Sequence, residues 1–300
     1  MATLSDFYHG ARPKTLSAAV APVAIGAALA YAVSRSSEFE NSRNFNLGVT
    51  LMCLVVAVAL QVGVNYANDY SDGKKGTDDN RVGPMRLVGS GRASERSVLI
   101  AMSVSFFIAG IAGIYVASQS SWWLILVGAA CIALAWFYTG GKHPYGYIGL
   151  GELAVFVCFG QVATVGTFYA NTHIFTYEAM IAGCIPGLYS VAILLANNIR
   201  DIQTDRQSGK KTFATRVGER NACHIFAGAF ILIACAILGL GFSFPLVFLV
   251  LLVMAFDFHL VRKMYAARMP PQFISILVET SRANLASAML IAALLFLGAA

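Results

Sequence analysis

The sequence predicts an all-α protein that crosses a membrane many times. Of its 300 residues, 58% are apolar and only 12% are charged, and the mean hydropathy is +0.68, whereas soluble domains carry about 25% charged residues. The apolar residues gather in segments of about 20 residues, the length a helix needs to cross ~30 Å of hydrocarbon. Because backbone polar groups in lipid must be bonded within their own segment, these segments are predicted to be helices.

Nine such segments follow one another along the chain. The first follows RPK and contains AYA at 30–32, as a signal peptide would, but its apolar stretch of about 19 residues exceeds the usual 7–15, so we expect a retained membrane helix. Only GLGFSFP separates the seventh and eighth spans. The alternative there is that these two spans form a single long, bent pair. The nine spans lie near 15–33, 47–66, 98–117, 121–138, 148–170, 178–199, 221–241, 242–262 and 283–300.

Basic residues are distributed unequally between alternate loops. Nineteen Lys and Arg fall on the side of the N-terminus, and only Arg35 and Arg43 fall on the other. Cytoplasmic loops carry such an excess, so we expect a cytoplasmic N-terminus and an external C-terminus. The net charge of +6 therefore reflects orientation in the membrane, and no nucleic-acid partner is expected. The six cysteines lie in or at the start of apolar spans without a Cys-x-x-Cys pair, which predicts neither disulfides nor a zinc site.

The chain shows no linker and no soluble domain, so residues 1–300 are expected to form a single membrane domain. Two polar segments within it resemble each other: NYANDYSDGKKG follows the second span, and NNIRDIQTDRQSGKK closes the sixth. Each combines asparagines, spaced aspartates, a glycine and a lysine pair. This repetition, four helices apart, indicates an internal duplication of helical units, as in many membrane proteins.

Six of the eight aspartates lie in these two acidic segments when the first is extended to NYANDYSDGKKGTDD at 65–79. At about 100° per residue, Asn65, Asp69 and Asp72 fall on one helical face. Asn197, Asn198, Asp201 and Asp205 do much the same over an arc of roughly 100°. Acids at a helix C-terminus oppose the helix dipole, and clustered carboxylates repel one another unless they share a cation. Carboxylate and amide oxygens suit Mg²⁺, which favours a metal site over merely solvated helix ends. The predicted metal ligands are Asp69, Asp72, Asp78, Asp201 and Asp205.

Basic residues flank both acidic segments. Carboxylates alone would repel a phosphate, whereas carboxylates that hold Mg²⁺ among Lys and Arg side chains would bind a diphosphate strongly. Each base taken singly is also explained as a membrane anchor, so only the collective arrangement indicates a polyanion. The residues predicted to bind substrate here are Asn65, Asn68, Asn197, Asn198, Arg200, Arg81, Arg86 and Lys210.

A third polar segment, YTGGKHPYGYIGLGE at 138–152, joins the fourth and fifth spans. Its Tyr138 and Lys142 fall on the same predicted side of the membrane as the acidic segments. A glycine-rich turn that carries Tyr and Lys suits a close approach to an anion. We therefore expect this segment to contribute to the same site.

These motifs resemble the UbiA family of intramembrane prenyltransferases. That family carries an N-D-x-x-D-x-x-x-D type motif after its second helix and a D-x-x-x-D motif after its sixth. The first is matched at 68–72, with Gly76 in place of the last aspartate, the second at 201–205, and a Y-x-x-x-K element at 138–142. The resemblance implies nine helices around a central cavity, with the active site facing the cytoplasm.

Three stretches favour the branch of this family that acts on 1,4-dihydroxy-2-naphthoate in menaquinone biosynthesis: ARPKTLSAAVAPV, NYANDYSDGKKGTD and YTGGKHPYGYIGLGE. In that branch Asp78 takes the last acidic position. The resemblance implies Mg²⁺-dependent transfer of a polyprenyl group from polyprenyl diphosphate to the naphthoate, in the plasma membrane, with loss of diphosphate and CO₂, giving demethylmenaquinone. The acceptor's carboxylate would be held by Arg12 and Lys14, for which simple anchoring is the alternative. The catalytic residues would be Asp69, Asp72, Asp201, Asp205, Lys142 and Tyr138.

Two other functions remain open at this stage. The acidic segments recognise a shared diphosphate, so another branch with 4-hydroxybenzoate, haem or a phosphoribose donor as acceptor fits them equally. A cation transporter would need charges near the middle of the bilayer. The predicted spans hold almost none, since Glu152 and Asp257 both lie towards the cytoplasmic ends, so transport is the less favoured alternative.

Overall fold

The computed structural model describes residues 2–36, 43–76 and 85–299, and within those ranges it contains helices and no strand. Eight helical segments there are long and apolar enough to cross a membrane, which confirms the all-α membrane architecture. The main helices are α1 Leu4–Gly10, α2 Ser17–Ser34, α3 Leu47–Lys74, α4 Glu95–Gln119, α5 Leu124–Phe137, α8 Tyr177–Arg200, α9 Ile202–Gln207, α10 Phe213–Val217, α11 Glu219–Ser243 and α14 Pro270–Ala299.

Two spans are built from several consecutive helical pieces. The fifth consists of α6 Gly151–Val155, the π-helical turn η4 Phe156–Val162 and α7 Ala163–Thr172. The eighth consists of η5 Pro245–Leu249, α12 Val250–Val253 and α13 Ala255–Ala266. Two short 3-10 turns, η1 Pro13–Thr15 and η3 Tyr145–Ile148, lie in the connecting loops.

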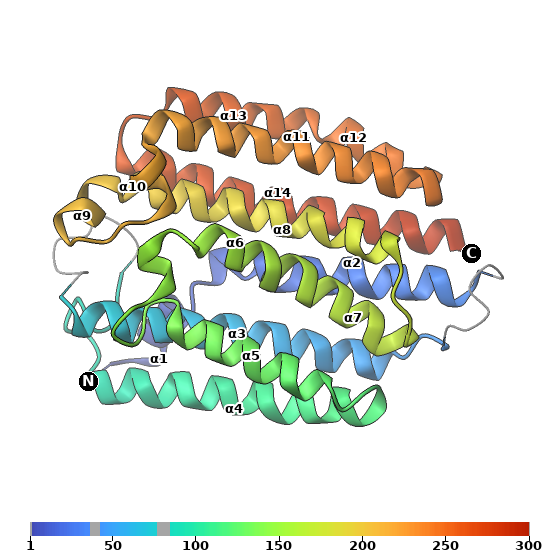
Figure 1. The fold of residues 1–300 in the computed structure, drawn as a ribbon, viewed down its shortest axis with the longest axis horizontal. Coiled ribbons are helices and arrows are strands. Elements are labelled where there is room, and N and C mark those ends of the chain that lie inside the picture. Colours follow the sequence, from blue (N-terminus) through green and yellow to red (C-terminus); the bar gives the residue numbers. More distant parts are fainter. Residues whose placement is uncertain (1, 37–42, 77–84, 300) are drawn as a thin grey trace.

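The fourth predicted span is shorter than the others. Helix α5 has 14 residues, which at about 1.5 Å per residue extend for about 21 Å, less than the ~30 Å of a hydrocarbon core. The number of nine crossings and their orientation therefore stay predictions. The seventh and eighth spans are separate, because the chain turns at Phe244 and α11 packs beside η5 and α13 (Figure 1).

The last helix begins earlier than the predicted start at residue 283. Helix α14 starts at Pro270 and includes Glu279, a charged residue that interrupts the apolar pattern. Lys263 of α13 pairs with Glu279 at 2.7 Å, so the charge is matched by a neighbouring helix. Apolar length alone could not reveal this partner.

The helices run side by side along the long axis of the molecule (Figure 1). Helices α1, α9 and α10 lie at one end, and the C-terminus lies at the other. The first acidic segment closes α3 at that first end, where Gly76 takes a left-handed conformation with φ of 68°. A glycine tolerates this conformation without strain, so the chain can turn away here, two residues after α3 ends.

Two groups of packed helices form the interior. The larger core joins α2, α8, α11 and α14 around fully buried side chains such as Ile25, Tyr189 and Phe226. The smaller group pairs α3 with α4. Helix α8 approaches η4 very closely at Gly160, where an added Cβ would lie 2.6 Å from the Cα of Gly187. Between the two groups lies the cavity described next.

Candidate active site

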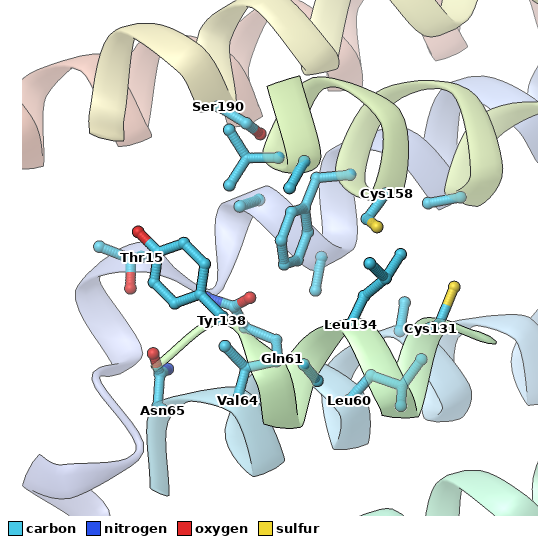
Figure 2. A pocket seen from close by; sticks show the side chains of 18 of the residues that line it. Thr15, Leu60, Gln61, Val64, Asn65, Cys131, Leu134, Tyr138, Cys158 and Ser190 are labelled. Carbon is cyan, nitrogen blue, oxygen red and sulfur yellow. The ribbon is translucent and has the colours of Figure 1, made fainter. Parts of the chain in front are cut away.

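A cavity of about 890 Å³ lies between the two helix groups. Its longer part is apolar and lined by α3, α4 and α5, with side chains such as Val56, Leu60 and Ile132. Its polar end is reached by the N-terminal segment and by all three polar segments of the chain. In Figure 2, Tyr138 and Asn65 lie at one space together with Leu60 and Val64. A central cavity with a polar end therefore exists where the sequence predicts it.

Eleven of the predicted site residues line this cavity. They come from the N-terminal segment, α3, the segment before α4, the loop after α5, and α8 with its following loop. The two acidic segments thus meet at one space although about 130 residues separate them. The eleven are Arg12, Lys14, Asn65, Asn68, Asp72, Arg86, Tyr138, Asn197, Asn198, Arg200 and Lys210.

Asp69 lies behind the cavity wall. It is fully buried, and its Oδ2 and Oδ1 accept hydrogen bonds from the backbone N–H groups of Leu87 and Val88 at 2.8 and 2.9 Å. The wall is formed instead by Asn65, Asn68 and Asp72 of the same helix. At about 100° per residue, Asp69 points about 60° away from Asp72. Asp69 therefore anchors the backbone at Leu87 and Val88, and the neighbouring Arg86 reaches the cavity.

Asp201 and Asp205 also lie behind the wall. Arg200 donates two hydrogen bonds to Asp201, from Nε to Oδ1 and from Nη2 to Oδ2, both at 2.7 Å. A bidentate pair of this kind has a fixed geometry. Asp205 accepts a hydrogen bond from Thr212 Oγ1 at 3.2 Å, and its carbonyl accepts the N–H of Lys210 at 2.8 Å. The Asp201 carboxylate therefore holds the Arg200 side chain, whereas Asp205 holds Lys210 through its backbone carbonyl.

The third polar segment contributes a residue that the sequence reasoning missed. Tyr147 Oη donates to Asp72 Oδ1 at 2.8 Å, and the ammonium groups of Lys75 and Lys210 each lie 4.9 Å from the centre of its ring. Its carbonyl accepts the N–H of Lys211. Tyr147 lies outside the Y-x-x-x-K spacing, and only its place in an aromatic, glycine-rich segment next to predicted site residues could have indicated it.

Lys75 links the first and third segments further. Its Nζ donates to the carbonyl of Thr139 at 2.6 Å, and Thr139 Oγ1 donates to Asn68 Oδ1 at 2.9 Å. Burial lowers the pKa of Lys75, and the negative charge of Asp72 opposes that change while the positive charge of Lys210 adds to it. The three polar segments are therefore joined by direct contacts at the polar end of the cavity.

Only one member of the Y-x-x-x-K element reaches the cavity. Tyr138 lines it, while Lys142 is exposed and outside the lining because the chain turns at Gly141, with φ of 77°. A phenol carries its proton at neutral pH, so Tyr138 can donate a hydrogen bond to a bound group.

The N-terminal segment brings two bases to the cavity. Arg12 takes a left-handed conformation, φ 55°, directly before Pro13, which is unusual for a residue other than glycine. Asn65 Nδ2 donates to the carbonyl of Ala11 at 2.9 Å, and Ser281 Oγ donates to the carbonyl of Lys14 at 2.7 Å. The segment is thus held between α3 and α14. Asp78 and Arg81 lie outside the described residues.

Residues 19–277 match the sequence model of the UbiA prenyltransferase family. The chain belongs to this family. It is 42% identical over 299 residues to the 1,4-dihydroxy-2-naphthoate octaprenyltransferase of Mycobacterium leprae, covering 99% of this chain and 98% of that protein. The predicted family membership is therefore confirmed.

Solved structures of UbiA homologues share the fold. The apo structure from Aeropyrum pernix K1 superposes with a TM-score of 0.68 at 16% identity and covers 94% of this chain and 97% of its own. A homologue from Archaeoglobus fulgidus bound to DMAPP and Mg²⁺ superposes with a TM-score of 0.62 at 12% identity, covering 96% and 99%.

The donor set at the polar end fits Mg²⁺ held jointly with a phosphate. Asp72 lines one space with Asn65 and Asn68 of α3 and Asn197 of α8, and Mg²⁺ typically takes one or two carboxylates together with substrate phosphates. Across the described ranges, no three His, Cys, Asp or Glu side chains form a group that could hold an ion alone. The assignment of all five aspartates as ligands stays a prediction.

Replacing Tyr147 with phenylalanine tests its contact with Asp72. Tyr147→Phe keeps the ring beside the two lysines and removes the hydroxyl. Since a hydrogen bond to a charged group contributes about 1.5–3 kcal/mol, we expect kcat/KM for prenyl transfer to fall about 10- to 100-fold. Tyr265→Phe, which removes a hydroxyl paired with His224 outside the cavity, is the matched control. Equal activities of the two variants would contradict the role of Tyr147.

Proposed function

We propose that this chain transfers a polyprenyl group from polyprenyl diphosphate to 1,4-dihydroxy-2-naphthoate, with release of diphosphate and CO₂. The observation that carries the proposal is the cavity itself, in which a cation-rich polar end continues into a long apolar part. A polyprenyl diphosphate has the same two-part chemistry, a polyanionic head on an apolar chain. The naphthoate as acceptor is supported by the name of the Mycobacterium leprae relative.

The diphosphate binds at the polar end. Arg86, Arg200 and Lys210 line that end, and guanidinium groups match phosphate oxygens with paired hydrogen bonds. Mg²⁺ would be held by Asp72 together with the diphosphate, and it would supply charge neutralisation for the leaving group. Ligation by Asp69, Asp201 or Asp205 would require those carboxylates to give up the hydrogen bonds described above. The Archaeoglobus homologue, whose structure is described as bound to DMAPP and Mg²⁺, supports both ligands.

The acceptor binds beside the reactive carbon of the donor. Arg12 and Lys14 hold its carboxylate, and the neutral Tyr138 hydroxyl donates a hydrogen bond to the bound substrates. Phe159 of η4 also lines the cavity, and the face of its ring stabilises positive charge that develops on the allylic carbon. The apolar walls exclude water, which would otherwise capture that carbon.

The bond changes balance without an added base. The allylic C–O bond breaks and its electron pair leaves with the diphosphate. The ring carbon that bears the carboxylate forms the new C–C bond, and its bond to the carboxylate then breaks, returning the electron pair to the ring as CO₂ departs. The immediate product is the quinol form of demethylmenaquinone.

The setting of this reaction is a membrane. The helices make the chain a multi-pass membrane protein, and we place it in the plasma membrane with the site facing the cytoplasm. The excess of Lys and Arg in the loops on the side of the acidic segments supports this orientation. A naphthoate made in the cytoplasm and a donor dissolved in the bilayer would then reach one cavity.

The choice of acceptor is tested with purified protein, polyprenyl diphosphate and Mg²⁺. We expect prenylation of 1,4-dihydroxy-2-naphthoate with equimolar CO₂ release, and no turnover of 4-hydroxybenzoate. Chromatography measures the products, and trapping of labelled CO₂ measures the decarboxylation. Turnover of 4-hydroxybenzoate with none of the naphthoate would assign the chain to another branch of the family.

The metal prediction is tested at Asp72, the predicted ligand that lines the cavity. Asp72→Asn should lower kcat by about 100-fold or more, since even the partners of metal ligands contribute about 10–100-fold, and chelation should abolish wild-type activity. Asp6→Asn, a change at an exposed ion pair with Arg92, serves as the control. Full activity of Asp72→Asn, or of chelated wild type, would reject the Mg²⁺ assignment.

The apolar part of the cavity contains glycines beside which there is open space. An added Cβ at Gly110 of α4 or Gly128 of α5 would meet no atom within 4 Å, and both residues line the cavity. Leucine there should fold normally and narrow the space for a long chain. We expect the ratio of kcat/KM for octaprenyl diphosphate to kcat/KM for geranyl diphosphate to fall about tenfold. A tenfold change corresponds to about 1.4 kcal/mol, which lies within the ~1–3 kcal/mol that overpacking an apolar site costs.

Gly228→Leu is the matched control for these glycine variants, because Gly228 has the same open surroundings on α11, outside the cavity. An unchanged preference in Gly110→Leu and Gly128→Leu would show that the donor chain does not follow the α4–α5 wall.

A further inference from the structure

Glu152 is a buried acid to which the mechanism above assigns no direct role. It lies at the start of α6, with 8% of its surface exposed. Its Oε1 accepts a hydrogen bond from Asn198 Nδ2 at 2.9 Å, and its Oε2 is enclosed without a hydrogen-bond partner among the described residues. A carboxyl group in such surroundings costs free energy, so its retention calls for a specific role.

The bond from Asn198 determines which way its amide faces. Asn198 lines the cavity, and Glu152 lies behind it. An amide has an NH₂ end and a carbonyl end of nearly equal size, and only the NH₂ end can donate to a carboxylate. With Nδ2 turned towards Glu152, Oδ1 remains as the acceptor, and it makes no hydrogen bond within the described part of the chain.

The residues around Glu152 add a donor to this acceptor. Gly151, the preceding residue, packs against Tyr138, so closely that an added Cβ would lie 3.2 Å from the Tyr138 hydroxyl. The start of α6 therefore contacts both Tyr138 and Asn198, and both line the cavity. A hydroxyl on an aromatic ring can accept a hydrogen bond from the Tyr138 hydroxyl and donate one to Asn198 Oδ1. A phosphate needs donors alone, and a divalent cation needs oxygen ligands alone.

We propose that Glu152 is a positioning residue for the acceptor: it holds the Asn198 amide so that Oδ1 accepts a hydrogen bond from a ring hydroxyl of the dihydroxy aromatic substrate. The proposal rests on the proposed function, because it assumes that acceptor. It assigns Glu152 to acceptor binding, apart from the diphosphate and the metal.

Glu152→Gln is the first test. The new amide can accept from Asn198 or donate to it, so the orientation of Asn198 is no longer determined. We expect KM for 1,4-dihydroxy-2-naphthoate to rise about tenfold, while KM for the polyprenyl diphosphate and the Mg²⁺ concentration for half-maximal rate stay unchanged. Glu178→Gln is the matched control, since Glu178 is also buried with an enclosed, unpartnered Oε2 but contacts Ser243 away from the cavity.

A reversed pair distinguishes positioning from mere packing. Asn198→Asp alone places two acids in contact and should impair acceptor binding. Combined with Glu152→Gln it restores one hydrogen bond with the donor and acceptor exchanged, and leaves a carboxylate oxygen facing the cavity. We therefore expect the double variant to recover most of the acceptor KM lost in Asn198→Asp, a coupling that a double-mutant cycle measures directly.

The outcomes separate this proposal from the function on which it rests. Wild-type protein that fails to prenylate the naphthoate would reject the proposed function. Normal wild-type turnover with an unchanged acceptor KM in Glu152→Gln would overturn only the role of Glu152. A change in Glu152→Gln confined to the Mg²⁺ requirement or to the donor KM would also overturn the role of Glu152. So would a double variant whose acceptor KM is no lower than that of Asn198→Asp. If Glu152→Gln fails to fold, the comparison of Asn198→Asp with the double variant decides.

Discussion

The site depends on positive charges at the cavity that acidic residues hold in place. Arg200 pairs with the Asp201 carboxylate behind the wall, and Lys210 lies 3.9 Å from Asp72 and donates its N–H to the carbonyl of Asp205. The Asp69 carboxylate binds the backbone next to Arg86. Removing charged groups from water is costly unless each is paired and hydrogen-bonded. These residues therefore let a largely apolar protein keep several positive charges at the end of the cavity where we propose that the diphosphate binds.

The three polar segments depend on one another through this network. Tyr147 of the third segment contacts Asp72 and Lys75 of the first and Lys210 of the second. Each of the three segments ends or follows a helix at the same end of the molecule. Contacts between the segments therefore add to what each segment's own helix provides. The polar end of the cavity is therefore an assembly of loops held together by side chains, on a scaffold of packed helices.

The apolar part of the cavity follows from a different constraint. The larger helix group is packed tightly, with glycines allowing η4 to touch α8, whereas α3, α4 and α5 leave open space around Gly110 and Gly128. Tight packing on one side provides rigidity, and sparse packing on the other provides room for an apolar chain. The same fold thus positions the polar end and leaves room for the lipid donor of the proposed function.

The sequence by itself determined the membrane architecture, the family and the segments that form the site, because composition, apolar length and motif spacing are local properties of the chain. The tertiary structure alone decided which side chains of those segments reach the cavity. Asp72 lines it and Asp69 does not, since the segment at Leu87 covers one side of α3; Lys142 turns outward at Gly141; and Tyr147 and Glu152 enter the site through partners far away in sequence. A helical face can be calculated from spacing, but what packs against that face depends on contacts between distant segments.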